Sequence, residues 1–271
     1  MNRTMRAVTA GALAVTTLAT LAAFSAVPAT QAAAETKKPK QGTVTIYLTR
    51  HGETMLNTLD RAQGWSDSPL TEEGRLSAEH LGAGLAESGV KFEAAYSADM
   101  VRHWETVSLA LDELDAKDEA TRDERLREIS FGKFEGAKNM EMWSAIATEL
   151  GYANVGELFT DPDFDFMEGL SAVARLSEGS GLVAETPEQV AARAVAALDD
   201  IAAKQAKHGG GEVLVVSSGI TIMLALGTLG ADLSELTGGI ENGAVSELVY
   251  DRGQWTINTV NDLSYVEAGS D

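Results

Sequence analysis

The segment Glu212–Ser218 constrains the fold most, because it contains four consecutive apolar residues, Val213-Leu214-Val215-Val216. Such a run is typical of a central strand in a parallel sheet that helices cover on both faces. A helix is predicted before it, since Thr186 is a good capping residue, Pro187 suits the first helical position and Gln189 can complete a capping box. The segment therefore predicts an α/β architecture.

The rest of the chain adds strand and helix patterns in alternating order. Residues 43–49 and 92–97 have strand patterns, and residues 245–250 and 255–260 are typical of a closing hairpin around Asp251-Arg252-Gly253. Two further helices are predicted, one after a cap at Thr71 and one after a cap at Asp99. Their buried faces are expected to contain Leu76, Leu81 and Leu85 in the first, and Trp104, Val107, Leu111 and Leu114 in the second. This order favours a three-layer α/β/α sandwich with its ligand site beyond the C-terminal ends of the strands.

The two ends of the domain and one interruption are also predicted from the sequence. Residues 1–34 have the pattern of a signal peptide, with Arg3 and Arg6 before an alanine-rich apolar run and small residues near Ala34 for cleavage. That run is shorter than the about 20 apolar residues of a spanning helix, so we expect a secreted or extracytoplasmic protein without a membrane anchor. Residues 35–42 form a polar leader, and residues 43–263 form the domain. Residues 139–185 interrupt its pattern with turn residues and amphipathic pieces, which predicts an inserted helical cap.

Charge and cysteine content exclude several classes of protein. The whole chain has a formal net charge of −20, and loss of Arg3 and Arg6 with the signal would make it more negative. Nucleic acids and anionic membranes require a basic face, so neither is an expected partner. The chain has no cysteine, which excludes disulfides and a lipoprotein anchor. Oligomeric state is left open by the sequence.

Polar residues follow the first predicted strand directly, in the order Arg50-His51-Gly52-Glu53. An arginine offers a planar cation, a histidine offers a nucleophile or base, and a glycine allows close backbone approach. The tripeptide Arg50-His51-Gly52 alone is weak evidence for catalysis, since a single histidine beside an arginine is more often structural.

Several separated motifs together resemble the histidine phosphatase superfamily, whose members are phosphoglycerate mutase-like. They are Thr49–Thr54 with Asn57, Gln63-Gly64 to Gly74, Ser97–Arg102, Leu126–Gly136, and Glu185–Pro187 with Arg193. The resemblance implies the phosphoglycerate mutase-like fold and a phosphate ester as the small-molecule substrate. It also implies that His51 is the nucleophile, that Glu128 is the proton donor, and that Arg50, Asn57, Arg102 and Gly219 surround the phosphate.

The chemistry agrees with these implied roles. A neutral imidazole can attack phosphorus and hold the phosphoryl group as phosphohistidine. The charge that develops on the phosphoryl oxygens is stabilised by fixed cations and amide donors, and a carboxylic acid can protonate the leaving oxygen. Glu53 is a second candidate acid, more suited to contacting donors in the pocket. The mechanism requires no metal or cofactor, and the four histidines have no metal-ligand spacing.

One position departs from the family pattern. Family members usually have a histidine after the last core strand, where this chain has Ser218 in Val216-Ser217-Ser218-Gly219. A serine can donate a hydrogen bond but carries no charge, and loss of one transition-state donor typically costs about 100- to 1,000-fold in rate. His103, which follows Arg102, is predicted to point about 100° away from it on a helix and not to substitute; His80 and His208 are expected on the surface.

Three functions therefore remain open at this stage. The first is hydrolysis of phosphate monoesters through a phosphohistidine at His51. The second is a phosphate-binding domain that is catalytically weakened or silent because of Ser218. The third is a phosphoglycerate mutase-type phosphotransferase.

Overall fold

The computed structural model describes residues 41–234, 236 and 238–270, so the predicted signal peptide and most of the leader lie outside it. The strands are β1 (Val44–Arg50), β2 (Phe92–Ser97), β3 (Thr121–Arg122), β4 (Gly211–Ser217), β5 (Val245–Asp251) and β6 (Gln254–Asp262). The helices are α1 (Met55–Thr58), α2 (Glu72–Glu87), α3 (Val101–Glu113), α4 (Asn139–Glu149), α5 (Val155–Thr160), α6 (Phe166–Leu176), α7 (Pro187–Lys207), α8 (Gly219–Thr228) and α9 (Ser264–Ala268). None of the described helices is long and apolar enough to cross a membrane.

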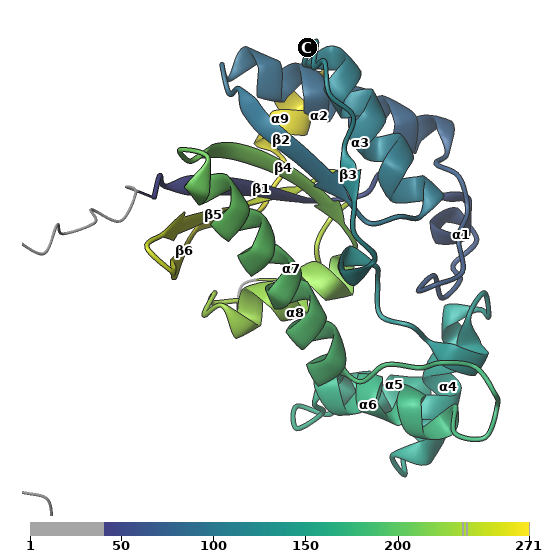
Figure 1. Cartoon of the computed structure of the whole chain (residues 1–271). Coiled ribbons are helices and arrows are strands. Elements are labelled where there is room, and N and C mark those ends of the chain that lie inside the picture. Colours follow the sequence, from purple (N-terminus) through teal and green to yellow (C-terminus); the bar gives the residue numbers. More distant parts are fainter. Residues whose placement is uncertain (1–40, 235, 237, 271) are drawn as a thin grey trace, which may run out of the picture. The chain divides into compact units, whose positions relative to one another are not determined.

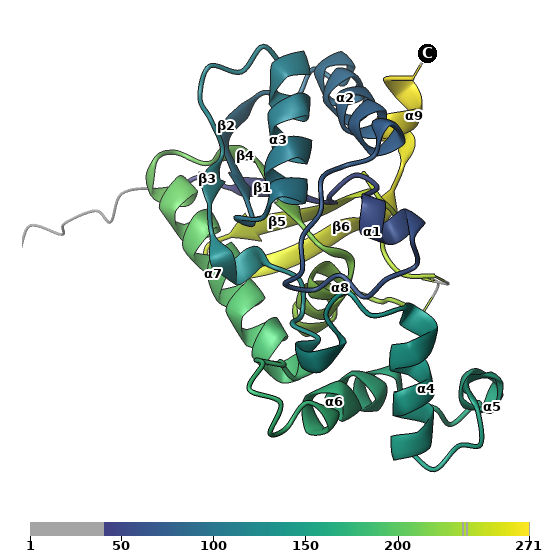
Figure 2. The ribbon, with the colours of Figure 1, turned by 90° about the vertical axis from the view of Figure 1, so that its right-hand side faces the viewer.

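The six strands form one mixed sheet in the order β3-β2-β4-β1-β5-β6. Strand β4 is parallel to both β1 and β2, and β5 is antiparallel to β1 and to β6. Helices α7 and α8 cover one face, whereas α2, α3 and α9 cover the other (Figures 1 and 2). The predicted three-layer α/β fold is confirmed, and the apolar run at β4 is the central strand that the sequence indicated.

Each face of the sheet has its own apolar core. Val44, Ile46, Val213 and Val215 pack with α7 and α8 on one side. Tyr47, Leu214 and Val216 pack with α2 and α3 on the other. Alternate residues of β1 and β4 thus point to opposite cores, as the two-residue period of a strand requires.

Helices α4, α5 and α6 form a third cluster beyond the N-terminal end of α7 (Figure 1). Its buried residues include Met142, Ile146, Leu158, Leu170 and Val173, which pack against Phe131, Phe134 and Val190 of the main domain. This segment corresponds to the predicted insertion, and we refer to residues 139–185 as the helical insertion. Its aromatic rings pack on one another: the ring centroid of Trp143 lies 4.9 Å from that of Phe159 and 5.7 Å from that of Phe166.

Three local predictions were wrong. Helix α3 begins after Met100 rather than after a capping Asp99, because the carboxylate of Asp67 accepts the N–H of Val101 at 2.6 Å and Asp99 binds Arg127 instead. Trp104 and Leu76 lie on outer helix faces, 42% and 43% exposed. Instead of packing in the core, the Trp104 ring lies under the guanidinium of Arg122, whose Cζ is 5.5 Å from the ring centroid.

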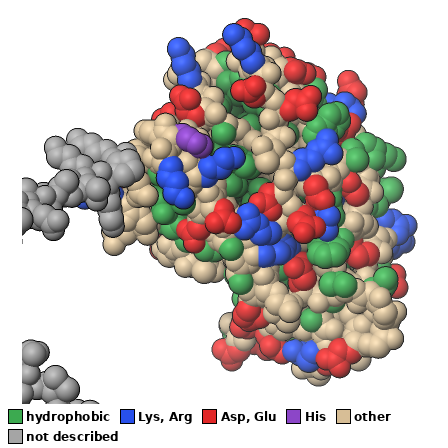
Figure 3. Space-filling view, in the orientation of Figure 1, with side chains coloured by type: hydrophobic (Ala, Val, Ile, Leu, Met, Phe, Trp, Pro, Cys, Tyr) green, Lys and Arg blue, Asp and Glu red, His purple; other side chains and the backbone are tan. Residues whose placement is uncertain are grey.

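Acidic and basic side chains are interspersed over the face of the domain seen in Figure 3, without a large basic field. The negative charge expected from composition is therefore spread over this surface. Recognition of an anionic ligand would then require cations that are concentrated in one place.

Candidate active site

The backbone of His51 is held at the C-terminal end of β1. Arg50, the last residue of β1, is in register with Ser217 of β4, and the N–H of His51 donates to the carbonyl of Ser217 at 3.0 Å. From the other side, the side-chain amide of Asn242 donates to the carbonyl of His51 at 2.7 Å. His51 therefore lies where the resemblance and the topology both place it, between the ends of two parallel strands.

The His51 imidazole is oriented for attack through Nε2. Its Nδ1 lies 2.8 Å from the carbonyl oxygen of Gly52, and because a carbonyl only accepts, Nδ1 must carry the proton. Burial lowers the pKa of His51 well below its ordinary value, and the charges of Arg102 and Arg50 lower it further. The ring is thus neutral at neutral pH, and its Nε2 keeps a free lone pair.

Gly52 cannot be replaced by a larger residue without moving the backbone. A Cβ at this position would lie 2.3 Å from the carbonyl oxygen of Gly74, at the start of α2. Its N–H donates to the hydroxyl of Thr106 in α3 at 3.0 Å. The glycine of the motif therefore allows α2 and α3 to approach His51.

Two buried guanidinium groups lie near His51. Arg50 donates from Nη1 to the carbonyl of Ile240 at 2.6 Å, and Arg102 is fully buried. Arg102 donates from Nη1 to Ser66 and Asp67 and from Nη2 to the carbonyl of Gly64. The Nε of each arginine is buried and has no partner among the described residues. These two N–H groups are unmet donors of the kind that an anion satisfies.

Burial lowers the pKa of both arginines, and the nearby carboxylate of Glu128 opposes that effect in each case. Arginine nevertheless stays charged in proteins because its ordinary pKa is so high. Positive charge is therefore concentrated beside His51, in a protein whose net charge is negative.

Glu128 is buried, 6% exposed, and its carboxylate caps the first turn of α8. Oε1 accepts hydrogen bonds from the N–H of Ile129 and from both the N–H and the hydroxyl of Thr221. Oε2 accepts only the N–H of Ile220, at 3.0 Å. Oε2 is thus the oxygen with room for a proton. The amides of Ile220 and Thr221 are occupied by this carboxylate, so they do not serve a phosphate.

The backbone around Glu128 is fixed by contacts from distant segments. Arg193 of α7 donates to the carbonyls of Arg125, Arg127 and Glu128 at 2.6–2.9 Å, and it forms an ion pair with Glu185. The carboxylate of Glu135 accepts the N–H groups of Gly64, Trp65 and Ser66. These contacts explain why the sequence motifs extend well beyond the residues that do chemistry.

The other predicted residues contribute less directly. Asn57 accepts the N–H of Thr54 as part of a capping box at α1, so its Oδ1 is occupied. Glu53 accepts the hydroxyl of Thr71 at 2.7 Å and supports the start of α2. Gly219 lies against Arg50, because a Cβ there would be 3.5 Å from Arg50 Nε. Ser218, the N-cap of α8, is 1% exposed.

His103 belongs to the site, contrary to the sequence prediction. It is fully buried, its ring centroid lies 5.2 Å from that of His51, and its Nε2 lies 2.7 Å from Ser218 Oγ. The first turn of α3 is enclosed on more than one side, so His103 is buried although it points about 100° away from Arg102. A better signal was present: His103, Val107 and Ala110 repeat at the spacing of one buried helix face.

Among the described residues, no group of three or more histidine, aspartate or glutamate side chains is arranged to hold a metal ion. The other two histidines lie away from this chemistry. His80 in α2 is half-buried, and His208 at the end of α7 is exposed.

Comparison with known proteins agrees with this geometry. Residues 46–263 match the histidine phosphatase superfamily (branch 1). A 2,3-bisphosphoglycerate-dependent phosphoglycerate mutase of Rhizobium etli is 41% identical over 93 residues, which are 34% of this chain and 44% of that protein. The chain thus spans less than half the length of the curated relatives it matches.

Solved structures match over a greater length. A phosphoglycerate mutase from Bacillus anthracis is 38% identical with a TM-score of 0.78, covering 86% of this chain and 99% of that one. The YhfR protein of Bacillus stearothermophilus is 27% identical with a TM-score of 0.64, covering 82% and 99%. A mycobacterial glucosyl-3-phosphoglycerate phosphatase, 21% identical with a TM-score of 0.56, shares the fold. From the family match and the arrangement around His51, the chain belongs to the histidine phosphatase superfamily.

Proposed function

We propose that the protein hydrolyses small phosphate monoesters through a phosphohistidine formed on His51. The observation that carries the proposal is the state of that ring: it is neutral, its Nδ1–H is bound to Gly52, and two arginines with unmet donors are near enough to lower its pKa. A group in that state can accept a phosphoryl group and needs no other base to activate it.

In the first step, the Nε2 lone pair attacks phosphorus and the bond from phosphorus to the ester oxygen breaks. The leaving oxygen needs a proton to depart as a neutral alcohol, and the proposed donor is the carboxyl group of Glu128, through Oε2. Arg50 and Arg102 stabilise the phosphoryl oxygens through the N–H groups that lack protein partners.

In the second step, a water molecule attacks the phosphohistidine, and the bond from phosphorus to Nε2 breaks. Glu128, now a carboxylate, takes a proton from that water and returns to its starting state. His51 regains its lone pair, and inorganic phosphate leaves. Each group ends the cycle as it began.

Two observations bear on the choice between hydrolysis and transfer. The signal pattern of residues 1–34 supports a location outside the cytoplasm, where phosphoglycerates are not abundant, and this favours a secreted hydrolase. The 38% identity to a structure described as a phosphoglycerate mutase favours the mutase alternative. A third possibility, phosphate binding with little turnover, rests on Ser218 at the position where the family resemblance implies histidine.

A direct test compares the mature protein with His51→Ala, using p-nitrophenyl phosphate and a panel of alkyl phosphates. Release of phosphate by the native protein and its loss in the variant are expected, together with an acid-labile phosphoryl group trapped on His51. Equal rates in the two proteins contradict the proposal. Interconversion of 2- and 3-phosphoglycerate faster than phosphate release would select the mutase, whereas vanadate binding without turnover would select the silent domain.

A further inference from the structure

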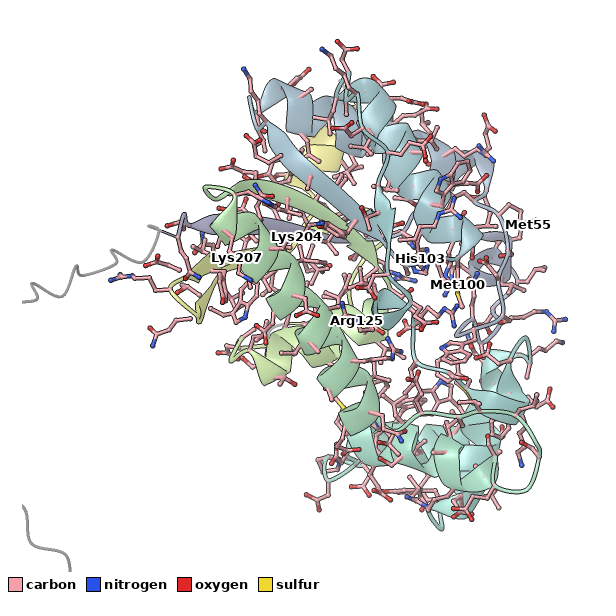
Figure 4. The ribbon with its side chains drawn as sticks, in the orientation of Figure 1. Met55, Met100, His103, Arg125, Lys204 and Lys207 are labelled. Atoms are coloured by element: carbon pink, nitrogen blue, oxygen red, sulfur yellow. The ribbon has the colours of Figure 1, made fainter. Side chains whose placement is uncertain are left out.

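Ser218 and His103 form a buried pair beside the nucleophile. They come from different elements, Ser218 from the N-cap of α8 and His103 from the first turn of α3, and 2.7 Å separates Ser218 Oγ from His103 Nε2. Figure 4 labels His103 and Met100 at the N-terminal end of α3, near the edge of the sheet. The neighbouring Gly219 lies against Arg50, so Ser218 shares a wall with the phosphate donors.

The protonation state of this pair decides what Ser218 can offer to a ligand. Burial lowers the pKa of His103 well below its ordinary value, and Arg102 and His51 lower it further, so the ring is neutral. A neutral imidazole has one N–H and one lone pair. If Nε2 carries the proton, it donates to Ser218 Oγ, and the serine O–H is free to donate elsewhere. If Nδ1 carries it, Ser218 must donate to Nε2 and has nothing left for an anion.

The surroundings favour the first arrangement. His103 Nδ1 is buried and has no partner among the described residues, and a buried N–H without an acceptor costs about 1–3 kcal/mol. A phosphoryl oxygen in the pocket accepts hydrogen bonds only, so it also selects the state in which the serine O–H points to it.

We infer that His103 is a positioning residue that directs the Ser218 hydroxyl toward the phosphoryl oxygens. The pair thereby supplies, from two elements, the donor that the family resemblance assigns to one histidine after the last core strand. This inference rests on the proposed phosphoryl chemistry at His51. Ser218 touches the substrate, and His103 acts through it.

The pair also explains why Ser218→His alone is not expected to raise activity. Ser218 is 1% exposed and its Oγ contacts the buried His103, so an imidazole at position 218 would have to displace His103. Ser218→His alone should therefore lower both activity and thermal stability. The exchange variant His103→Ala with Ser218→His moves the imidazole to the end of β4 and vacates the first turn of α3.

The experiment measures kcat and KM for p-nitrophenyl phosphate in His103→Phe, Ser218→Ala, the double variant of these two, and the exchange variant. His208→Phe, which changes an exposed histidine at the end of α7, is the matched control. Thermal unfolding of every variant identifies those that do not fold.

Each single variant is expected to lower kcat by about 100- to 1,000-fold with little change in KM. The kcat of the double variant should be no lower than that of the less active single variant, because both changes remove the same donor. The exchange variant should recover at least about tenfold over the double variant. A merely structural role for His103 predicts no such recovery.

The inference is overturned if His103→Phe, folded, keeps kcat within about threefold of the native value, or if the losses of the single variants multiply in the double. Failure of the proposed function has a different signature, since His51→Ala would then leave phosphate release unchanged. If the native protein has no turnover, vanadate affinity replaces kcat: His103→Phe and Ser218→Ala should each weaken it at least about tenfold, and unchanged affinity overturns the inference.

Discussion

The pocket at the ends of β1 and β4 and the helical insertion are built on opposite principles. In the pocket, polar side chains are buried and most are hydrogen-bonded, but the Nε atoms of Arg50 and Arg102 and Nδ1 of His103 have no partner among the described residues, and Nε2 of His51 keeps a free lone pair. The insertion is held by apolar packing, and most of its side-chain hydrogen bonds are exposed, such as that from Arg175 to Glu168. Fixed polar groups are thus concentrated in the pocket, whereas the insertion is mainly an apolar framework.

Glu128→Gln is the change in the pocket from which we expect the largest effect on the rate of hydrolysis. The amide cannot protonate a leaving oxygen, so kcat/KM for alkyl phosphates should fall by about 10²- to 10⁴-fold. The value of kcat/KM for p-nitrophenyl phosphate reports phosphohistidine formation and not the later attack by water, so it should fall much less, because this leaving group departs without a proton. Rates for the two substrates, measured with the same preparation, test this.

The ratio of those two losses is the informative quantity. The glutamine NH₂ can also face the N–H groups of Ile220 and Thr221 at the start of α8, and this contact between donors can lower the stability of the variant. Equal losses for both substrates would argue that Glu128 only supports α8.

Arg102→Met tests whether the pocket is also a structural element. The variant leaves Asp67 and the carbonyls of Gly64 and Ser66 without their buried donor. Asp67 is partly exposed, so the main cost is the carbonyl oxygens left without their donor. An unsatisfied buried group typically costs about 1–3 kcal/mol, and the free energy of unfolding should fall by that order. Urea denaturation measures it, and a loss below about 1 kcal/mol would show that the ordered 64–67 segment does not depend on this arginine.

Leu170→Ala is the corresponding change in the helical insertion. Leu170 is fully buried in that cluster, and its truncation should cost about 2–5 kcal/mol. Because the chemistry lies elsewhere, kcat for p-nitrophenyl phosphate should stay within a few-fold while KM for larger phosphate esters changes. A fall in kcat for the small substrate as large as that of the Glu128 variant would show that the two regions are not separable.

The smallest effect expected is on the pH dependence of stability. His51 and His103 are buried neutral, with folded pKa values below the unfolded value of about 6.5. Between the folded and unfolded pKa values, the unfolded chain binds protons that the folded chain does not, so stability is complete above about pH 6.5 and falls as pH decreases.

Each of the two histidines contributes a slope of at most about 1.4 kcal/mol per pH unit in that window. His103→Phe should flatten the slope by up to this amount. Urea denaturation at several pH values from 4.5 to 6.5 measures the difference between variants, in which the shared contribution of the carboxylates cancels. Parallel curves for His103→Phe and the native protein would contradict a buried neutral His103.

The strands and helix caps could be predicted from the sequence better than the contacts between distant side chains. The apolar run at β4, the strand before Arg50 and the caps at Thr71 and Thr186 all follow from local patterns, and each is confirmed. Asp99 was misassigned because its competitor for the start of α3, Asp67, comes from a segment 34 residues away. His103 was missed for a similar reason: its partner Ser218 lies 115 residues further along the chain.

The two glutamates that flank the helical insertion have a consequence for variation and engineering. Glu135, before it, is fixed to the amides of residues 64–66, and Glu185, at its end, is fixed by Arg193 and by the N–H of Ser130. The stretch between these two glutamates is therefore held at both ends by contacts of its own flanks. A replacement segment joined at Glu135 and Glu185 should leave the backbone around Glu128 in place if it also fills the apolar contacts with Phe131, Phe134 and Val190.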